Sequence, residues 1–419
     1  MLNYILEFLL QDKSYIKYVG YTNDASEWKN YKVVIMPSEF FDYHKANTPL
    51  APHTPLQKLE GTPILFGTPS ISHTKDLVVI KADIVASAFY LLSRYEEKII
   101  SRRDSHGRFS ALDSITMKED FLHRPVVDEY GVILRNALRS VGVNIPEPKS
   151  EMSVTLTHDV DVPYVYRSFI SILGGIKRGE FKTLFKSICK SLEKNPFFTF
   201  PWLLDQDEKL EKARKIYFLR SPLFPEYYDR PYLRINSSDM RKLIHILKKH
   251  NVELGLHASY ASAKHLELIP QEKLSIEKVV GSPLKTNRNH FLRLTSNKQL
   301  DALISSGIKE DFTIGFADMP GFRMGTCRPV RYINPDTLEV KDLILHPLTM
   351  MDASFSNYAN MDFAEAYETA CKLIDQVNKH GGELVLLWHN SEVRRGNYHK
   401  QLYKNLISYI SQYTQTYKL

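Results

Sequence analysis

Thr157-His158-Asp159-Val160-Asp161 is the stretch of this 419-residue chain that decides its fold class. It ends an alternating run, Met152 to Leu156, whose period of two residues predicts a β-strand. Both aspartates then leave the carboxyl end of that strand on the same side. Catalytic groups of α/β barrels and open α/β sheets gather at this edge. Two adjacent like charges are unsuited to one shared role, so we expect one carboxylate to hold a cation and the other to move a proton.

Further segments place polar side chains where strand-like runs end. They are Val252–Ser262 with His257, the expected loop Asn287–Arg293 with Arg288 and His290, Ile314–Arg323 with Asp318, and Glu383–Asn390 with His389. A histidine at a strand end is a good metal ligand when it is neutral. A single His or Arg at such a position is more often structural, but the shared position predicts that these side chains meet at one face of a barrel.

Composition limits the class of protein. A hydrophobic content of 43% and a charged content of 25% are typical of a globular protein with a large core. The formal charge is +7, but the sequence has no dense Lys/Arg run and no nucleic-acid-binding signature, so we expect no nucleic-acid partner. Cys189, Cys327 and Cys371 are far apart, which excludes a disulfide framework and favours a reducing compartment.

The first ten residues are apolar, but Glu7 interrupts them. We interpret them as a core strand or helix rather than as a signal peptide. No apolar run approaches the ~20 residues that a membrane-spanning helix needs. We therefore expect a cytoplasmic protein without a transmembrane segment, and the sequence leaves the oligomeric state open.

The first part of the chain has the pattern of a smaller α/β domain, which we place at residues 1–147. Its strand-like runs are Tyr31–Met36, Pro63–Gly67 and Leu77–Ile80, and a helix from Ile84 to Glu97 follows with Asp83 as its expected N-cap. The polar segment Asp104–Phe109 is interpreted mainly as a hydrogen-bonded structural loop. Pro146–Ser150 is a plausible linker. Strands and helices alternate beyond it and predict a second α/β domain over residues 149–419.

With these motifs on the chain, residues from about 150 to 419 resemble the polysaccharide deacetylases of the NodB-homology type, carbohydrate esterase family 4. The likeness is greatest to bacterial members with an extra N-terminal α/β domain. It implies a distorted (β/α) barrel and a metal-dependent hydrolase. Thr157 to Asp161 matches the first family motif, which implies Asp159 as catalytic base and Asp161 as metal ligand. Leu387-Trp388-His389 matches the Leu-x-His motif and implies His389 as catalytic acid, for which Asp318 is our candidate orienting acid.

Two family motifs match only in part. His257 corresponds to the first histidine of His-Ser/Thr-x-x-His, but Ala261 stands where the second one belongs. Arg288-Asn289-His290-Phe291 resembles Arg-x-Pro-aromatic with His290 in place of proline, and it implies that Arg288 orients the catalytic base. A catalytic zinc site normally has three protein ligands. We therefore predict that His290 supplies the missing imidazole, and His265 is a weaker candidate.

The resemblance implies removal of acetyl groups from an N-acetylated or O-acetylated sugar. The cofactor would be a divalent metal; we expect zinc, although such ligands also suit Co, Ni or Fe. The expected substrate contacts are the aromatic residues Tyr260, Phe322 and Trp388 and the cations Arg293 and Arg323. A cytoplasmic location would fit a nucleotide- or lipid-linked precursor better than a mature polymer. The sugar and the acetyl linkage cannot be read from the sequence.

Two alternatives remain open. Because of Ala261, the chain could be a catalytically degraded protein that binds carbohydrate on the deacetylase scaffold, and metal content would separate this from the enzyme. A glycoside hydrolase using Asp159 and Asp161 is less favoured. Residues two apart on one strand end are poorly placed to flank a glycosidic bond from two sides.

Overall fold

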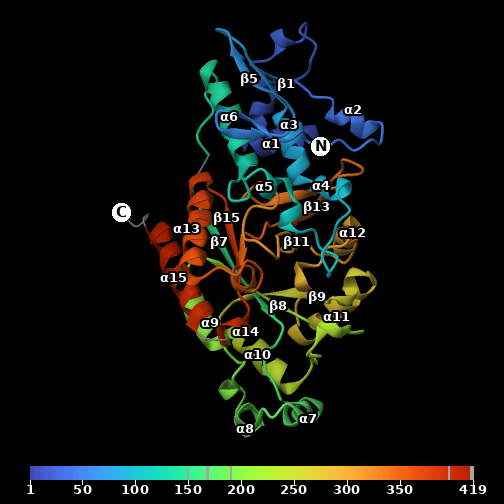
Figure 1. Cartoon of the computed structure of the whole chain (residues 1–419), viewed down its shortest axis with the longest axis vertical. Helices are drawn as coiled ribbons and strands as arrows, with labels where there is room; N and C mark the ends of the chain where they lie inside the picture. Colours follow the sequence, from blue (N-terminus) through green and yellow to red (C-terminus); the bar gives the residue numbers. More distant parts are fainter. Residues whose placement is uncertain (149–150, 167–168, 189–190, 395–396, 416–419) are drawn as a thin grey trace.

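The computed structural model describes residues 1–148, 151–166, 169–188, 191–394 and 397–415, so Cys189 lies outside it. Cys327 and Cys371 are free thiols. Figure 1 shows a smaller upper group of elements in blue and cyan above a larger group that runs from green to red. We call residues 1–148 the N-terminal part and residues 151–415 the C-terminal part. Among the described residues, no helix is long and apolar enough to cross a membrane.

The N-terminal part is built on a four-stranded sheet with the order β1-β2-β6-β5. Its strands are β1 (Val19–Tyr21), β2 (Val33–Ile35), β5 (Gly67–His73) and β6 (Val78–Ala82). The first three in the order are parallel, and β5 runs antiparallel to β6. A separate hairpin joins β3 (Gln57–Leu59) to β4 (Thr62–Ile64). The predicted strand at Pro63–Gly67 is interrupted: Pro63 and Ile64 belong to β4 and Gly67 begins β5, because the chain changes sheets at Leu65 and Phe66.

Helices cover this sheet, and the buried N-terminal helix is one of them. They are α1 (Leu2–Leu10), α2 (Phe40–Lys45), α3 (Ile84–Leu92), α4 (Glu96–Ile99), α5 (Ile115–Lys118) and α6 (Val126–Ser140). Asp83 caps α3 as predicted, since its Oδ1 accepts from the Ala86 N–H at 2.9 Å. The helix ends before Glu97 because Arg94 has a left-handed backbone with φ 59°.

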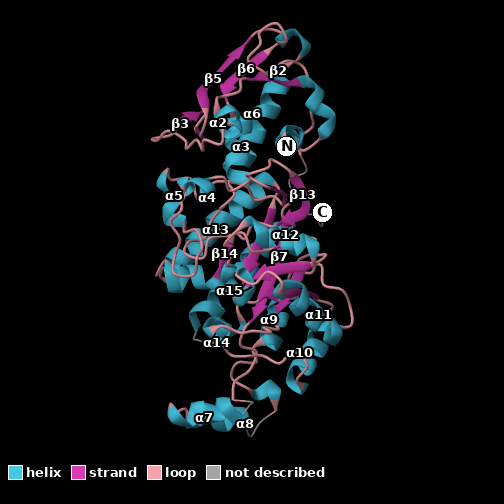
Figure 2. Cartoon of the chain, turned by 90° about the vertical axis from the view of Figure 1, so that its right-hand side faces the viewer, coloured by secondary structure: helices cyan, strands magenta, loops and turns pink. Residues whose placement is uncertain are grey.

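The C-terminal part contains a curled sheet of nine strands in the order β12-β13-β11-β10-β9-β8-β7-β15-β14 (Figure 2). The strands are β7 (Ser153–Val160), β8 (Arg214–Leu219), β9 (Glu253–Ala258), β10 (Thr286–Asn289), β11 (Glu310–Asp311), β12 (Val330–Ile333), β13 (Val340–Leu345), β14 (Met350–Met351) and β15 (Glu383–Leu387). All neighbours pair in parallel except β12 with β13. The fold is mixed α/β with a half-barrel sheet.

Two local predictions for this sheet are wrong. Asn287–Arg293 was expected as a loop, but it begins inside β10, which hydrogen-bonds between β9 and β11. Ile314–Asp318 was expected as a strand, but it has no regular structure. Its apolar residues are buried in the core as an irregular segment, so hydrophobicity alone misassigned it.

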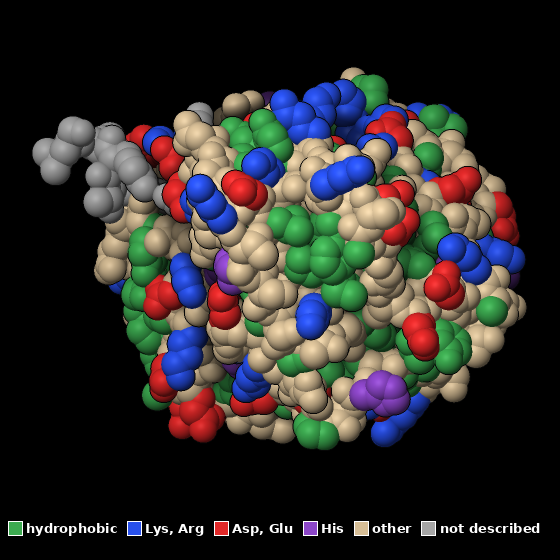
Figure 3. All heavy atoms as spheres, turned by 90° about the horizontal axis from the view of Figure 1, so that it is seen from above, with side chains coloured by type: hydrophobic (Ala, Val, Ile, Leu, Met, Phe, Trp, Pro, Cys, Tyr) green, Lys and Arg blue, Asp and Glu red, His purple; other side chains and the backbone are tan. Residues whose placement is uncertain are grey.

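Helices flank the half-barrel. They are α7 (Phe169–Lys177), α8 (Phe181–Ile188), α9 (Phe200–Asp207), α10 (Ser238–Lys249), α11 (Leu268–Val280), α12 (Asn297–Ser305), α13 (Phe363–His380), α14 (Asn390–Arg394) and α15 (Asn397–Gln415). In Figures 1 and 2, α7 and α8 lie at the end of the molecule opposite the N-terminal part. Seen from above in Figure 3, basic and acidic side chains are interspersed with hydrophobic ones.

Large and small residues are matched inside the half-barrel. A Cβ atom at Gly255 of β9 would lie 2.5 Å from the Phe218 ring of β8, so this close approach requires glycine. The Arg288 guanidinium lies 4.8 Å from the centre of the same ring. The Phe218 ring therefore packs between Gly255 and the Arg288 guanidinium, close to the carboxyl ends of the central strands where the polar residues lie.

Candidate metal centre

The carboxyl ends of four strands bring the predicted polar residues together. Asp159 is near the end of β7, His257 lies in β9, and His290 follows β10 directly. Arg288 and His257 are paired across β10 and β9, so their side chains belong to the same level of the sheet. His389 comes just after β15. The convergence predicted from strand ends is thus present in the structure.

Asp161, His257 and His290 form a compact set of potential metal ligands. One ligand atom from each lies within 4.8 Å of the others. The Asp161 Oδ1 atom is 3.3 Å from His257 Nε2 and 3.4 Å from His290 Nε2. The structure therefore places His290 beside the other two, where the sequence predicted that it would replace the histidine missing at Ala261.

The outer nitrogens of both imidazoles are fixed by acceptors. His257 Nδ1 lies 2.9 Å from the Arg288 carbonyl oxygen, and His290 Nδ1 lies 3.2 Å from Asp229 Oδ1. Each acceptor requires a proton on Nδ1, which leaves a lone pair on each Nε2. Imidazoles that ligate metals are commonly oriented in this way by a carbonyl or a carboxylate.

Two of the ligand atoms at the centre of the cluster have no hydrogen-bond partner among the described residues. Neither Asp161 Oδ1 nor His257 Nε2 makes a hydrogen bond to any residue that the structure describes, although both atoms are buried. Burial of His290 outweighs the attraction of Asp161 and lowers its pKa to about 4, so its ring is neutral at pH 7. Burial also opposes the charged form of His257, but Asp159 and Asp161 outweigh it and raise the pKa of that ring. A carboxylate and two lone pairs that face one another are costly to bury without a cation. The three residues therefore fit a divalent metal ion.

Asp159 is placed for proton transfer rather than as a fourth member of this set. Its Oδ1 lies 3.2 Å from Arg288 Nη1, and its Oδ2 lies 3.6 Å from His257 Nε2. Arg288 is buried and is held by further hydrogen bonds to the Phe312 carbonyl and the Thr157 hydroxyl, at 3.0 and 2.7 Å. The fixed guanidinium therefore pairs with the Asp159 carboxylate and orients it.

His389 approaches both carboxylates. Its Nε2 is 3.9 Å from Asp159 Oδ2 and 3.8 Å from Asp161 Oδ2. Asp352, directly after β14, contacts His389 Nδ1 at 2.8 Å and accepts from its backbone N–H at 2.6 Å. Burial opposes the charged ring, but Asp352 and the other carboxylates outweigh it and raise the His389 pKa to about 10.

The predicted orienting role of Asp318 is wrong. Its carboxylate instead accepts from the Ser110 hydroxyl and from the Ala111 N–H, the latter at 3.0 Å. The irregular backbone at 314–318 turns this side chain toward the N-terminal part. Asp352 takes its place, and it carried a usable signal because it ends the apolar run Leu348–Met351.

Two further residues of the centre were missed by the sequence analysis. Arg220, fully buried after β8, has Nε 3.8 Å from Asp161 Oδ1 and donates from Nη2 to the Asp161 carbonyl at 3.1 Å. Asp229 contacts His290 and accepts from the Tyr260 N–H at 2.8 Å. Arg220 follows the strand-like run Ile216–Leu219, whereas Asp229 ends a three-residue 3-10 helix, Tyr227–Asp229, and carried no signal.

All five predicted substrate contacts are buried in this structure, which contradicts their expected role. Phe322 and Trp388 are 1% and 0% exposed in the hydrophobic core, where they cannot stack on a sugar. Arg323 is buried and donates to the Gly315 carbonyl and to Glu97. Arg293 is buried and donates to the carbonyls of His106 and Tyr260. Both guanidinium groups serve the fold.

Tyr260 belongs to an aromatic cluster beside the centre. Its ring lies 4.7 Å from that of Tyr228 and 5.5 Å from that of Phe291, and His290 packs against Phe291 at 4.8 Å. Tyr260 itself is buried, whereas Tyr228 is 39% exposed. Tyr228 is therefore the member of this cluster that presents an aromatic face to solvent.

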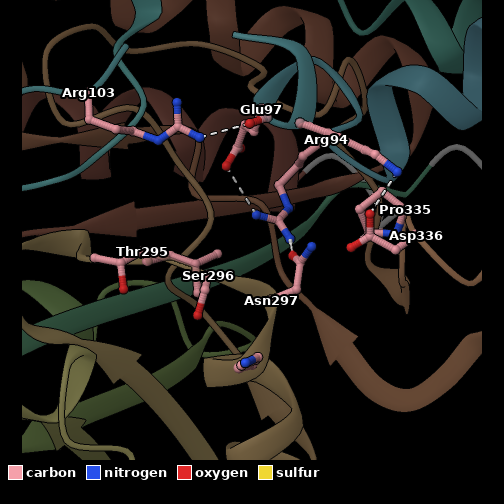
Figure 4. A pocket seen from close by; sticks show the side chains of 11 residues that line it. Arg94, Glu97, Arg103, Thr295, Ser296, Asn297, Pro335 and Asp336 are labelled. Carbon is pink, nitrogen blue, oxygen red and sulfur yellow. Dashed lines mark hydrogen bonds and ion pairs between the residues drawn. The ribbon is translucent and has the colours of Figure 1, made fainter. Parts of the chain in front are cut away.

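A separate cavity of about 300 Å³ lies between the N-terminal part and the C-terminal part (Figure 4). It is lined by Arg94, Glu97, Lys98, Arg103, Leu294, Thr295, Ser296, Asn297, Lys298, Pro335 and Asp336. Arg94 pairs with Glu97 at 3.4 Å and Lys98 with Asp336 at 2.8 Å, so these charges are largely satisfied within the chain. The metal-ligand candidates do not line this cavity.

Comparisons with known proteins give a family model for the start of the chain and distant structural neighbours. A family of unknown function, DUF7033, matches residues 1–142. A provisionally assigned polysaccharide deacetylase from Mycobacterium smegmatis is a structural neighbour with 15% identity and a TM-score of 0.43, covering 65% of this chain and 87% of that one. No curated protein matches the sequence.

Two more solved structures have still lower similarity. A provisionally assigned polysaccharide deacetylase from Pseudomonas aeruginosa is 10% identical with a TM-score of 0.38, and the match covers 65% of this chain and 91% of that one. A CE4 family pseudoenzyme from Bacillus anthracis is 10% identical with a TM-score of 0.33, and the match covers 62% of this chain and 61% of that one.

Proposed function

We propose that this chain is a metal-dependent hydrolase that removes acetyl groups from an N-acetylated or O-acetylated sugar. The observation that carries the proposal is the convergence of Asp161, His257 and His290, within which Asp161 Oδ1 and His257 Nε2 are buried without a hydrogen-bond partner among the described residues. The motif resemblance of residues 157–161 and 387–389 to polysaccharide deacetylases supplies the reaction class.

The surrounding residues suit acetyl hydrolysis. A divalent cation held by the three ligands, zinc in this proposal, would polarise the acetyl carbonyl and lower the pKa of a water molecule. Asp159 takes the proton of the attacking water, and Arg288 pairs with that carboxylate and orients it. His389 gives a proton to the departing amine or hydroxyl, while Asp352 holds its ring. Acetate and a free amino sugar or hydroxyl group are the products.

The substrate in this proposal is a carbohydrate, with a nucleotide- or lipid-linked precursor as one form. Tyr228, 39% exposed, and Tyr358, 40% exposed, are candidates to stack on the apolar face of a pyranose ring. Both tyrosines lie near Phe291. The Tyr228 ring packs on the Phe291 ring, with 5.4 Å between ring centres. Arg108 donates to both the Tyr358 hydroxyl and the Phe291 carbonyl. These tyrosines replace Phe322 and Trp388 as the proposed sugar contacts.

One observation favours a second candidate, a carbohydrate-binding protein without catalysis. The buried Arg220 guanidinium lies next to the ligand set, with Nη1 3.1 Å from His290 Nδ1 and 3.3 Å from its Nε2. A permanent positive charge there could balance Asp161 without any metal. Ala261, at the position of the missing motif histidine, points in the same direction.

Metal analysis of the purified protein decides between the two candidates. We expect about one equivalent of a divalent metal in the wild type, lost in both Asp161→Ala and His257→Ala, because a mononuclear site needs its three ligands. His265→Ala, which removes a 60% exposed imidazole, is the matched control and should retain the metal. Acetate release from acetylated sugars would then test the reaction. No metal in the wild type, even after incubation with zinc, would sink the enzyme proposal in favour of binding alone.

A further inference from the structure

A loop of the N-terminal part reaches the candidate metal centre. We call residues 104–111 the bridging loop; Asp104 contacts Arg108 within it, through Oδ2 and Nε at 2.7 Å. Resting on the proposed function, we propose that this loop is a working part of the metal site: Arg108 is a positioning residue that fixes the turn carrying His290. The N-terminal part would then determine the metal affinity of the C-terminal part.

The turn after His290 needs external support. Phe291 and Leu292 both have left-handed backbones, with φ 63° and φ 51°. Neither residue is glycine, so both conformations are unfavourable and persist only where the surroundings impose them. The turn determines where the His290 imidazole lies relative to Asp161.

Arg108 supplies that support. Its Nη1 donates to the Phe291 carbonyl at 3.0 Å, at the first left-handed residue of the turn. Its Nη2 donates to the Tyr358 hydroxyl at 3.3 Å, and its side chain is only 7% exposed. A planar guanidinium held at several nitrogens fixes the carbonyl in direction as well as in distance, which a lysine could not do.

A second contact holds the other side of the turn. Arg293 donates from Nε to the His106 carbonyl at 2.8 Å. The His106 ring also packs on Phe291 at 4.8 Å between ring centres and lies 3.2 Å from the Tyr260 hydroxyl through Nδ1. The bridging loop therefore contacts the turn both through its own backbone, at the His106 carbonyl, and through its side chains, Arg108 and His106.

The far end of the loop is anchored by Asp318. Its carboxylate accepts from Ser110 and Ala111, which ties the bridging loop to the C-terminal part at a point separate from the turn. Asp318 thus acts on the centre through the loop rather than through His389. With both ends held, the loop can transmit the position of the N-terminal part to His290.

Cobalt binding tests this inference, because Co²⁺ absorption reports both affinity and ligand geometry. Orienting residues around metal ligands typically contribute about 10- to 100-fold to affinity. We therefore expect Arg108→Ala to raise the Co²⁺ dissociation constant at least ~10-fold and to change the absorption spectrum. Added guanidinium should restore both. Arg102→Ala, which removes a 79% exposed arginine near the loop, is the matched control and should behave as the wild type.

The outcomes separate this inference from the proposed function. If the wild type binds Co²⁺ and Arg108→Ala binds it equally well with the same spectrum, the role of the bridging loop is overturned and the metal site stands. If the wild type binds neither Co²⁺ nor Zn²⁺, both proposals fall. Should Arg108→Ala not fold, Asp104→Asn removes the charge partner of Arg108 more mildly, and unchanged Co²⁺ affinity in that variant would also overturn the inference.

Discussion

The half-barrel carries a buried group of histidine and carboxylate side chains at each end of its strands. At the amino ends, His346 lies between Glu383 and Glu310, with Nδ1 and Nε2 at 2.5 and 3.0 Å from the carboxylates. Glu310 also pairs with Arg214, and Thr155 donates to Glu383. We call this the closed cluster. At the carboxyl ends, Asp161, His257 and His290 form the open cluster.

The two clusters differ in protonation although they contain the same residue types. Burial opposes the charged form of His346, but Glu310 and Glu383 outweigh it and raise its pKa to about 9, so a proton joins the two carboxylates. In the open cluster, the nearby carboxylates likewise raise the His257 pKa, but burial dominates at His290 and lowers its pKa to about 4. A neutral imidazole beside a buried carboxylate, as at His290 and Asp161, is therefore the feature that distinguishes the open cluster as a candidate ligand site. The following predictions test that distinction.

Asp159→Asn should have the largest effect of the substitutions considered, and the effect should be on kcat. Loss of the general base should lower kcat by about 10³-fold, since proton transfer by a positioned side chain contributes 10²–10⁴-fold. Metal content should stay at the wild-type level because Asp159 is not one of the three ligand candidates. Steady-state acetate release together with metal analysis would check both statements, and loss of the metal would contradict the division of roles between Asp159 and Asp161.

His346→Gln should destabilise the closed cluster and leave the open one intact. Removing the cation leaves Glu383 and Glu310 buried with one fewer partner, for which we expect about 3 kcal/mol less free energy of unfolding near neutral pH. The raised pKa means that the contribution of His346 is fully present below the unfolded value, about 6.5, and is lost as pH rises through about 9.

Urea unfolding of the wild type and His346→Gln at several pH values would measure this. The stability difference should shrink as pH rises past about 9. A difference that stays constant across this range would show that the His346 charge does not hold the closed cluster together. Metal stoichiometry should be the same in both proteins.

His290→Ala should weaken metal binding by about 100-fold, because it deletes one of three ligands while the folded core remains. His265→Ala is again the matched control, since its imidazole is exposed and was the weaker candidate. Titration of the metal-free proteins with zinc would compare them. Equal affinities for wild type and His290→Ala would return His290 to a structural role.

Asp352→Asn should have the smallest effect of the four, about a 10-fold decrease in kcat. The amide can still contact His389 but no longer carries the charge that favours the imidazolium. The Michaelis constant and the metal content should change little because Asp352 does not contact the ligand candidates' side chains. Asp318→Asn is the comparison. A larger loss of kcat in Asp318→Asn than in Asp352→Asn would support Asp318, as first predicted from the sequence, as the acid that orients His389.

The sequence predicted those residues of the candidate metal centre that follow or end regular strands. Asp159, Asp161, His257 and His389 were found because alternation and apolar runs mark β7, β9 and β15. Arg220 and Asp352 obey the same rule and were readable. Asp318 was misassigned because an irregular buried segment has the hydrophobicity of a strand.

Other features depend on contacts that no local pattern encodes. Asp229 reaches His290 across 61 positions of sequence, and Arg108 reaches the Phe291 carbonyl across 183. The segment Asp104–Phe109 was interpreted as a hydrogen-bonded loop, and the hydrogen bonds are present. Its partners in the C-terminal part could not be predicted, because they depend on how two folded regions pack.

The absence of a side chain at Gly255 lets β9 pack closely against residues of β8 and β10, and we expect this constraint in any sequence that keeps this centre. An alanine there would push its methyl group into the Phe218 ring and the Thr286 hydroxyl, 2.5 and 2.7 Å away. The ring could retreat only by disturbing Arg288, which lies over it. We therefore expect divergent sequences to change positions 255 and 218 together or not at all. Such paired variation would be an evolutionary signature of the arginine that holds Asp159.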